Sequence, residues 1–186
     1  MKNKKLSGII ILGLCLFSIS LMGALPKNWS RGLKLDQVRV YRGEHEGVQY
    51  LFFATLVKSP DSSLAREKGD LILRTGIAEA MVQEFFRQWR SVVKKNKKMA
   101  LSRKQERKWG LKIKSLKANV SGARIFEKLS ARRGRTTTLR ILGGMEYELF
   151  MKHRQEAIAY AWQQNWLSES KAKEAQKSMQ GLDRVQ

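Results

Sequence analysis

The stretch Leu71–Val93, with the sequence LILRTGIAEAMVQEFFRQWRSVV, decides the fold of this chain. Large apolar residues recur in it every four positions and form one stripe: Leu73, Ile77, Met81, Phe85, Trp89 and Val93, widened by Ala80, Phe86 and Val92. This spacing predicts a long amphipathic helix, which we expect to run from Pro60 to Lys95 with Ser59-Pro60-Asp61 as its start. Gly69 and Gly76 each weaken such a helix by about 1 kcal/mol relative to alanine. Tertiary packing must therefore support its first half.

Two strands are expected before this helix. Val48–Lys58 is rich in β-branched and aromatic residues, which favours a buried strand. Gln37–Arg42 alternates apolar and polar residues, and the glycine-bounded segment 43–47 between the two reads as a turn. These segments predict a β-hairpin.

The segment Lys94–Lys117 is the most basic part of the chain, with Glu106 as its single acidic residue. We interpret it as a short helix over Leu101–Trp109 that Gly110 stops, followed by a strand or extended segment over Leu111–Leu116. The basic residues are expected to form a continuous solvated surface.

A second strand pair is expected at Val120–Leu129 and Thr136–Lys152, interrupted at 131–135, with Gly143-Gly144 marking a bulge or a close approach. Met145–Met151 continues as a strand or begins a helix, and Gln155–Leu167 is helical. The order of elements predicts an α+β fold, in which one long helix and a C-terminal helix pack on an antiparallel sheet of about four strands. We place the single domain at 48–167, a lead-in segment at 25–47, and a polar, fraying tail at 168–186.

The N-terminus has the layout of a secretory signal peptide. Three lysines precede an uncharged run from Leu6 to Leu25, and Gly23-Ala24 supplies small residues before Pro26. We therefore predict a signal peptide over residues 1–24, with an uncleaved membrane anchor as the alternative. Cys15 lies within this run and is interpreted as an ordinary apolar residue of it. Export would place the protein in the periplasm or at the cell surface of a bacterial-type envelope.

The charge balance indicates an anionic partner. The chain has a formal net charge of +21, and loss of residues 1–24 would leave 34 basic and 16 acidic residues, or +18. For an exported protein, lipopolysaccharide or anionic lipid headgroups, teichoic-type polymers and acidic proteins are the relevant anions. No cysteine follows Cys15, so neither a disulfide nor a catalytic thiolate is expected beyond it.

The sequence offers no convincing catalytic, metal-binding or cofactor-binding site. His45 lies between Glu44 and Glu46, but a stable metal site brings together three or four ligands in space. His153 lies between two cations, and no glycine-rich phosphate loop precedes a helix. Glu146 and Glu148 would share one face if their segment were a strand, which makes them the best carboxylate pair for a hydrolase.

Two basic segments are the best candidates for a contact surface. Aromatic rings beside cations can lie against lipid headgroups or nucleic acid bases, and arginine makes paired hydrogen bonds to phosphate and carboxylate. We expect the partner-binding residues to be Lys94, Lys95, Lys97, Lys98, Arg103, Lys104, Arg107, Lys108, Trp109, Arg132, Arg133 and Arg135. A helix-packing role for Trp109 stays open, and Trp162 and Trp166 are either core residues or a docking face.

Three segments carry a resemblance to a known family. They are Tyr50–Val57 followed by Ala65-Arg66-Glu67-Lys68, the segment Ala118–Lys128, and the strand and helix that close the domain. Together they resemble the LPP20-like family, which includes flagella-associated outer-membrane proteins, over residues 48–162. The resemblance implies a non-enzymatic envelope or surface-structure component. This chain departs from the lipoprotein N-terminus usual in that family, which leaves lipid anchoring without support.

We therefore expect an exported, non-catalytic envelope protein. It would be a structural or binding component, for instance of a flagellar or other surface appendage, whose basic face docks on an acidic protein or an anionic polymer. The alternative is a membrane-anchored protein that binds polyanions or nucleic acid, although the N-terminal lysines favour an outward-facing domain. An envelope hydrolase using Glu146 ranks third.

Overall fold

The computed structural model describes residues 25–35, 37–60, 62–116 and 123–183. In chain order its elements are β1 (Val38–His45), β2 (Val48–Ser59), α1 (Ser62–Lys95), the short 3-10 helix η1 (Lys97–Met99), α2 (Arg103–Ser115), β3 (Ala123–Arg133), β4 (Thr136–Glu146), α3 (Tyr147–Gln163) and α4 (Glu169–Asp183). The expected signal peptide at 1–24 lies outside the described residues. None of the helices within those ranges is both long and apolar enough to cross a membrane.

The four strands form one antiparallel sheet in the order β1-β2-β4-β3, so the α+β prediction is confirmed. Each predicted strand pair is a hairpin. The first turns at Glu46 and Gly47, both with positive φ, which narrows the expected turn from five residues to two. The second turns at Gly134 and Arg135, while Ala131–Arg133 still belong to β3. Val120–Gly122, expected in this strand, lie outside the described residues.

The central strand β2 is buried on both faces, as its composition predicted. Leu51 and Phe53 belong to the core shared with the helices. Tyr50 and Phe52 point to the opposite face, where they pack with Trp29 of the lead-in segment. The indole Nε1 of Trp29 also donates a hydrogen bond to Glu127 of β3 at 2.7 Å. The part of the lead-in before β1 therefore covers the outer face of the sheet, whereas β1, which the prediction placed in the lead-in, is itself a strand of the sheet.

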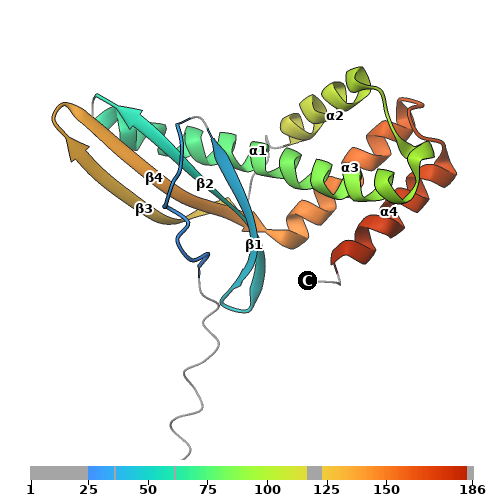
Figure 1. Ribbon diagram of the computed structural model, residues 1–186, viewed down its shortest axis with the longest axis horizontal. Coiled ribbons are helices and arrows are strands. Elements are labelled where there is room, and N and C mark those ends of the chain that lie inside the picture. Colours follow the sequence, from blue (N-terminus) through green and yellow to red (C-terminus); the bar gives the residue numbers. More distant parts are fainter. Residues whose placement is uncertain (1–24, 36, 61, 117–122, 184–186) are drawn as a thin grey trace, which may run out of the picture.

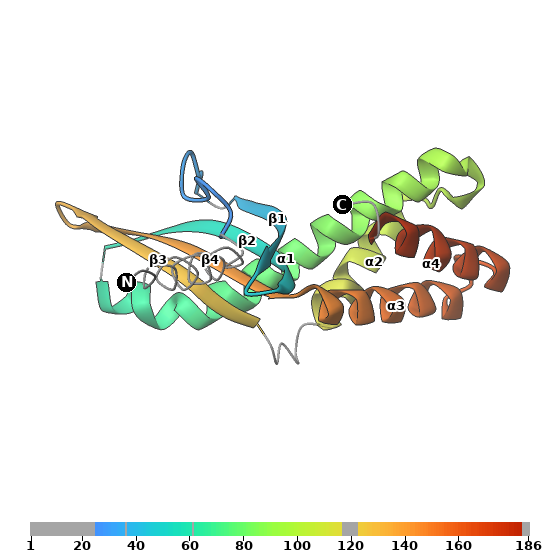
Figure 2. The ribbon, with the colours of Figure 1, turned by 90° about the horizontal axis from the view of Figure 1, so that it is seen from below.

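Helix α1 joins the two halves of an elongated molecule (Figure 1). Its first part runs along one face of the sheet, and it then continues into a helical half, where it packs with α2 and α4 (Figure 2). The helix begins at Ser62 and not at Pro60, because Ser59 is still paired with Thr137 as the last residue of β2. The predicted end at Lys95 is confirmed.

Gly76 of α1 and Gly143 of β4 make room for the ring of Phe53. A Cβ atom at either glycine would collide with that ring. Because the ring is completely buried between the helix and the sheet, close packing supports the glycine-containing part of α1. The expected close approach at Gly143 is thus confirmed.

The predicted break at Gly110 and strand at Leu111–Leu116 are wrong. Helix α2 runs through Gly110 to Ser115. It begins with a capping box, in which Ser102 and Gln105 bond each other's backbone amides. Gly110 is buried, and a Cβ atom there would lie 3.6 Å from the ring of Phe86. At this distance a methyl group would make an ordinary contact, so Gly110 packs against α1 without being required for close approach, and it does not end the helix.

The fraying tail predicted for residues 168–186 is wrong over most of its length. Residues 169–183 form helix α4, which buries Ala172, Ala175 and Met179. Helix α3 begins at Tyr147, immediately after β4, and therefore includes most of the helix expected at Gln155–Leu167. The strand expected to continue toward Lys152 ends at Glu146.

Candidate functional site

The basic residues at the end of α1 and the start of α2 lie on one folded corner of the helical half. Lys94 and Lys95 occupy the last turn of α1, where cations are favourable against the helix dipole. Asn96 then caps η1 by accepting a hydrogen bond from the amide of Lys98 at 3.1 Å. Beneath this turn Met99 is completely buried. We call this corner the helical-end surface; its cations are Lys94, Lys95, Lys97, Lys98, Arg103, Lys104, Arg107 and Lys108, all exposed.

Trp109 does not belong to this surface. Its side chain is completely buried, and its ring centroid lies 4.7 Å from that of Phe85 and 4.9 Å from that of Trp89. Its indole Nε1 donates a hydrogen bond to the backbone carbonyl of Ala157 on α3 at 2.7 Å. The expectation that Trp109 contacts a partner is corrected: it attaches α2 to the core.

The arginines at the β3–β4 turn form a separate surface. Arg132, Arg133 and Arg135 are exposed, and Gly134 between them has a φ of +60°, as this tight turn requires. The hairpin tip lies at the opposite end of the molecule from α2 (Figure 1). The structure therefore separates the two basic segments that were expected to share one contact surface.

A buried polar cluster, which sequence reasoning missed, connects the sheet to the helical half. Glu84 of α1 is 3% exposed, and it accepts hydrogen bonds from Nε and Nη2 of Arg87, both at 2.7 Å. The amide of Gln88 donates to Glu84 at 2.8 Å and to the hydroxyl oxygen of Tyr147 at 2.7 Å. These bonds connect α1 to the first residue of α3.

Asp183 at the end of α4 completes this cluster. It accepts hydrogen bonds from Nη1 and Nη2 of the buried Arg154, at 3.0 and 2.8 Å, and from the hydroxyl of Tyr147 at 2.8 Å. Arg154 also donates to Gln88 at 2.8 Å, and Arg42 of β1 lies over the Tyr147 ring, 4.0 Å from its centroid. The cluster thus joins β1, α1, α3 and α4.

The protonation of this cluster follows from its contacts. Burial and the hydrogen bond to Asp183 raise the pKa of Tyr147 well above its ordinary value, so its hydroxyl stays protonated. The hydrogen bonds to Glu84 raise the pKa of Arg87. A tyrosine held as a donor to a carboxylate is a poor nucleophile or base. The arrangement is suited to holding four elements together.

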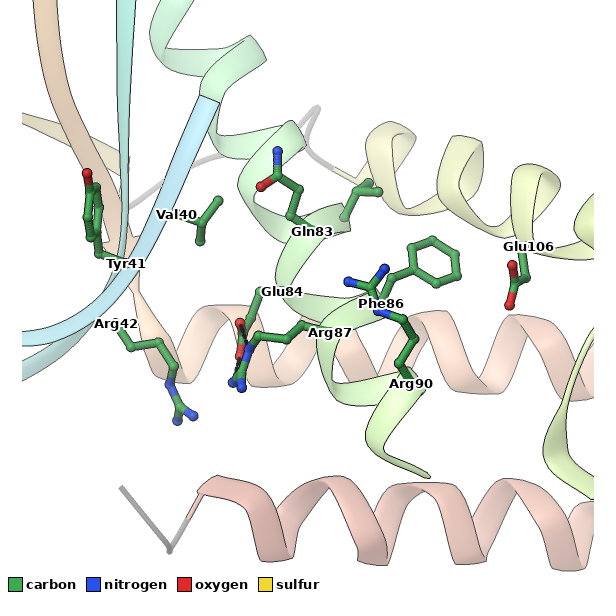
Figure 3. Close-up of a pocket in the computed structure, with 10 residues that line it drawn as sticks. Val40, Tyr41, Arg42, Gln83, Glu84, Phe86, Arg87, Arg90 and Glu106 are labelled. Carbon is green, nitrogen blue, oxygen red and sulfur yellow. Dashed lines mark hydrogen bonds and ion pairs between the residues drawn. The ribbon is translucent and has the colours of Figure 1, made fainter. Parts of the chain in front are cut away.

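An open groove of about 950 Å³ adjoins the cluster, between the edge strand β1 and helix α1 (Figure 3). Its apolar lining comes from Val40, Val82 and Phe86, and the side chains of Arg42, Arg87 and Arg90 reach into it from β1 and α1. Glu84 and Glu106 also contribute to the lining. Its charges are therefore mixed, in contrast to the helical-end surface.

Glu146 and Glu148, the carboxylates expected as the best pair for a hydrolase, lie in different elements. Glu146 ends β4, whereas Glu148 lies in the first turn of α3, so the two do not share a strand face. They line a shallow hollow of about 710 Å³ together with Glu44 and Asp183. Asp183 is bonded to Arg154 and Tyr147, as described above.

The two histidines have ordinary structural contacts. The His45 ring packs edge-on against Phe126, with centroids 5.2 Å apart, and Nδ1 of His153 lies 3.2 Å from Glu156. In the part of the chain that the structure describes, no three His, Cys, Asp or Glu side chains are grouped so that they could hold a metal ion. Trp162 is 47% exposed, whereas Trp166 is half-buried and packs on Tyr160 at the edge of the core. A docking role for Trp162 stays a prediction.

Comparison with known proteins adds no further assignment: no family model, curated protein sequence or solved structure matches this chain.

Proposed function

We propose that this protein is an exported, non-catalytic component of a bacterial-type cell envelope that docks on an anionic partner through its helical-end surface. The observation that carries the proposal is the composition of that surface. Eight exposed cations occur between Lys94 and Lys108, and Glu106 is the single acidic residue in that segment. Such a density of one charge sign attracts anions over a distance of about 10 Å at moderate ionic strength.

The packing beneath the surface supports a binding role. Met99 and Trp109 are both completely buried below the exposed lysines and arginines, and Ser102 caps the helix that carries four of them. The cations are therefore presented by a folded support and not by a flexible tail. A fixed arrangement lowers the entropy lost when a partner binds.

The polar cluster supports a non-catalytic role. Hydrogen bonds link Glu84 to Gln88, Gln88 to Arg154 and Arg154 to Asp183, and the hydroxyl of Tyr147 donates a hydrogen bond to Asp183. Apart from Nε of Arg154, which is buried without a hydrogen-bond partner among the described residues, these side chains pair their buried polar atoms within the cluster. The partner would be an acidic protein or an anionic envelope polymer, and a flagellar or other surface appendage is one setting in which such a component would act.

Charge reversal tests the docking surface. We would compare the unaltered chain with a variant carrying Lys97→Glu, Lys98→Glu, Arg103→Glu and Lys104→Glu on immobilised polyglutamate and on immobilised polyphosphate. The matched control reverses Lys27, Lys34, Lys152 and Lys177, which are exposed elsewhere and give the same change in net charge. We expect at least a tenfold loss of binding in the first variant and a much smaller loss in the control.

Equal losses in the two variants would show that binding depends on net charge alone and would overturn the proposed surface. Circular dichroism on both variants checks that they remain folded. Preference for polyglutamate would indicate an acidic protein partner, and preference for polyphosphate a phosphate-bearing polymer.

Export is tested on the native protein. Cell fractionation followed by mass spectrometry of its N-terminus should find a chain that starts near Leu25 in the periplasmic or appendage fraction. An intact Met1 in the inner membrane would contradict the exported form and support the alternative, a membrane-anchored protein that binds polyanions.

A further inference from the structure

The β3–β4 hairpin carries a second cationic surface, independent of the first. From Lys128 to Arg140 the sequence contains no acidic residue. We call Lys128, Arg132, Arg133 and Arg135, which are all exposed, the hairpin-end surface. Both surfaces are thus built on well-defined turns, one between helices and one between strands.

The length of α1 sets the separation of the two surfaces. Ser59 pairs with Thr137 near the hairpin turn, which places that turn beside the start of α1 at Ser62. Lys95 of the helical-end surface is the last of the 34 residues of α1. At about 1.5 Å per residue the helix spans about 50 Å. Figure 1 shows the hairpin turn and α2 toward opposite ends of the long axis.

A hollow in the middle of the molecule is lined by more acidic than basic residues, with Arg42 as the one cation among the described residues that line it. Glu44, Glu146, Glu148 and Asp183 line the hollow where β1, β4, α3 and α4 meet. The Debye length is about 10 Å at 0.1 M salt, so surfaces about 50 Å apart act independently. Along its long axis the molecule therefore has two cationic ends, separated by a middle part whose groove and hollow carry both signs of charge.

Each half of the molecule also carries exposed apolar side chains. Leu129, 38% exposed, follows Lys128 in the hairpin. In the helical half, Leu111 of α2 is 62% exposed and Trp162 at the end of α3 is 47% exposed. Cations combined with exposed leucine and tryptophan are typical of surfaces that bind anionic lipid, because the apolar groups enter the interface that the cations reach.

We propose that the two ends bind two separate anionic lipid surfaces, so that one molecule bridges them. This inference rests on the proposed function, since the helical-end surface is one of its two contacts. It adds the chemical class of the partner, a lipid bilayer with anionic headgroups, and a second contact at the hairpin. Arginines at the hairpin turn suit this role because a guanidinium can donate two hydrogen bonds to one phosphate.

Vesicles separate binding from bridging. The full chain is mixed with vesicles of phosphatidylcholine and phosphatidylglycerol in equal parts; co-sedimentation reports binding and light scattering reports clustering. Vesicles of phosphatidylcholine alone control for apolar insertion of the N-terminal run. We expect the unaltered chain to bind and cluster the anionic vesicles only.

The decisive variant carries Arg132→Glu, Arg133→Glu and Arg135→Glu. It should still bind anionic vesicles through the helical-end surface, but its clustering signal should fall at least tenfold. A control with Lys27→Glu, Lys152→Glu and Lys177→Glu, which has the same net charge, should cluster vesicles as the unaltered chain does.

Three results would overturn the inference. The unaltered chain could bind without clustering, the hairpin variant could cluster undiminished, or clustering could proceed equally on phosphatidylcholine alone. The first two leave the helical-end surface and the proposed function intact. The proposed function has a separate test. It fails if polyanion binding is unchanged in the variant that reverses the charges of Lys97, Lys98, Arg103 and Lys104.

Discussion

The guanidinium of Arg154 on α3 lies 2.8 Å from the carboxylate of Asp183, the last residue of α4. The side chain of Arg154 is 1% exposed and that of Asp183 is 13% exposed. A buried cation is tolerated only when its charge is compensated. This pair therefore explains why a polar C-terminal segment is held as a helix against the core.

Asp183→Ala should destabilise the protein strongly, because Arg154 would be left buried without its carboxylate partner. The expected loss is about 3–5 kcal/mol of unfolding free energy, measured by urea denaturation. Glu169→Gln, which removes an exposed ion pair with Lys173 in the same helix, is the control and should have little effect. A loss no larger than that of the control would contradict a structural role for the buried pair.

Tyr147 should make stability depend on pH in the alkaline range. Its pKa is raised in the folded protein above the ordinary value of 10.0, so its contribution is complete below that value. As the pH rises from there toward the folded pKa, ionisation of the unfolded chain lowers the unfolding free energy. Tyr147→Phe removes this term, so stability should fall less steeply in the variant. Parallel slopes in alkaline denaturation experiments would disprove the assignment.

Gly76→Ala and Gly181→Ala should have opposite effects although both lie in helices. At Gly76 the methyl group collides with Phe53, and overpacking of this kind costs about 1–3 kcal/mol. At Gly181 nothing lies within 4 Å, so the gain in helix propensity should stabilise the protein by about 1 kcal/mol. Thermal denaturation of the two variants measures both, and a stabilised Gly76→Ala would show that the Phe53 packing is incorrectly assigned.

Trp29→Ala should uncover the outer face of the sheet. Trp29 is 5% exposed and packs with Tyr50 and Phe52, so its removal should cost about 3–5 kcal/mol of unfolding free energy. Trp162→Ala, at an exposed position, is the control and should change stability little. If both variants unfold at the same urea concentration, the lead-in does not cover the sheet.

The sequence predicts the elements whose signal is local. Helix α1 has a stripe of large apolar residues, and β2 has a run of β-branched and aromatic residues, so both could be recognised without their partners. The packing of α1 on β2 explains why α1 contains Gly76. From the sequence alone this glycine could only be interpreted as a residue that lowers helix stability.

The elements that depend on distant partners were not predictable. In the sequence, Gly110 is typical of a helix end. In the structure it lies within α2 and packs against Phe86 of α1. Helix α4 offers only Ala172, Ala175 and Met179 as apolar contacts, and its strongest tie is to Arg154, which lies 29 residues before Asp183. A polar segment with so few apolar residues reads locally as a tail.

In the candidate site, too, local features could be predicted from the sequence and long-range features could not. Exposure of the lysines and arginines could be expected, because these residues are rarely buried. Their separation into two surfaces could not, since the place of the hairpin turn is set by the pairing of β2 with β4. The polar cluster was missed because Glu84 and Gln88 lie beside the apolar stripe, and the partners of Gln88, Tyr147 and Arg154, lie on another helix.

Asp183 follows its partner Arg154 by 29 residues, which has a consequence for the order of events during synthesis. Gln88 and Arg154 are made well before Asp183, and until α4 has emerged from the ribosome the Arg154 side chain has no carboxylate to bury against. The growing chain therefore cannot complete this buried cluster until the residues of α4 have been added. A chain that stays incompletely folded during its own synthesis remains accessible to chaperones and to a translocation machinery for that whole period.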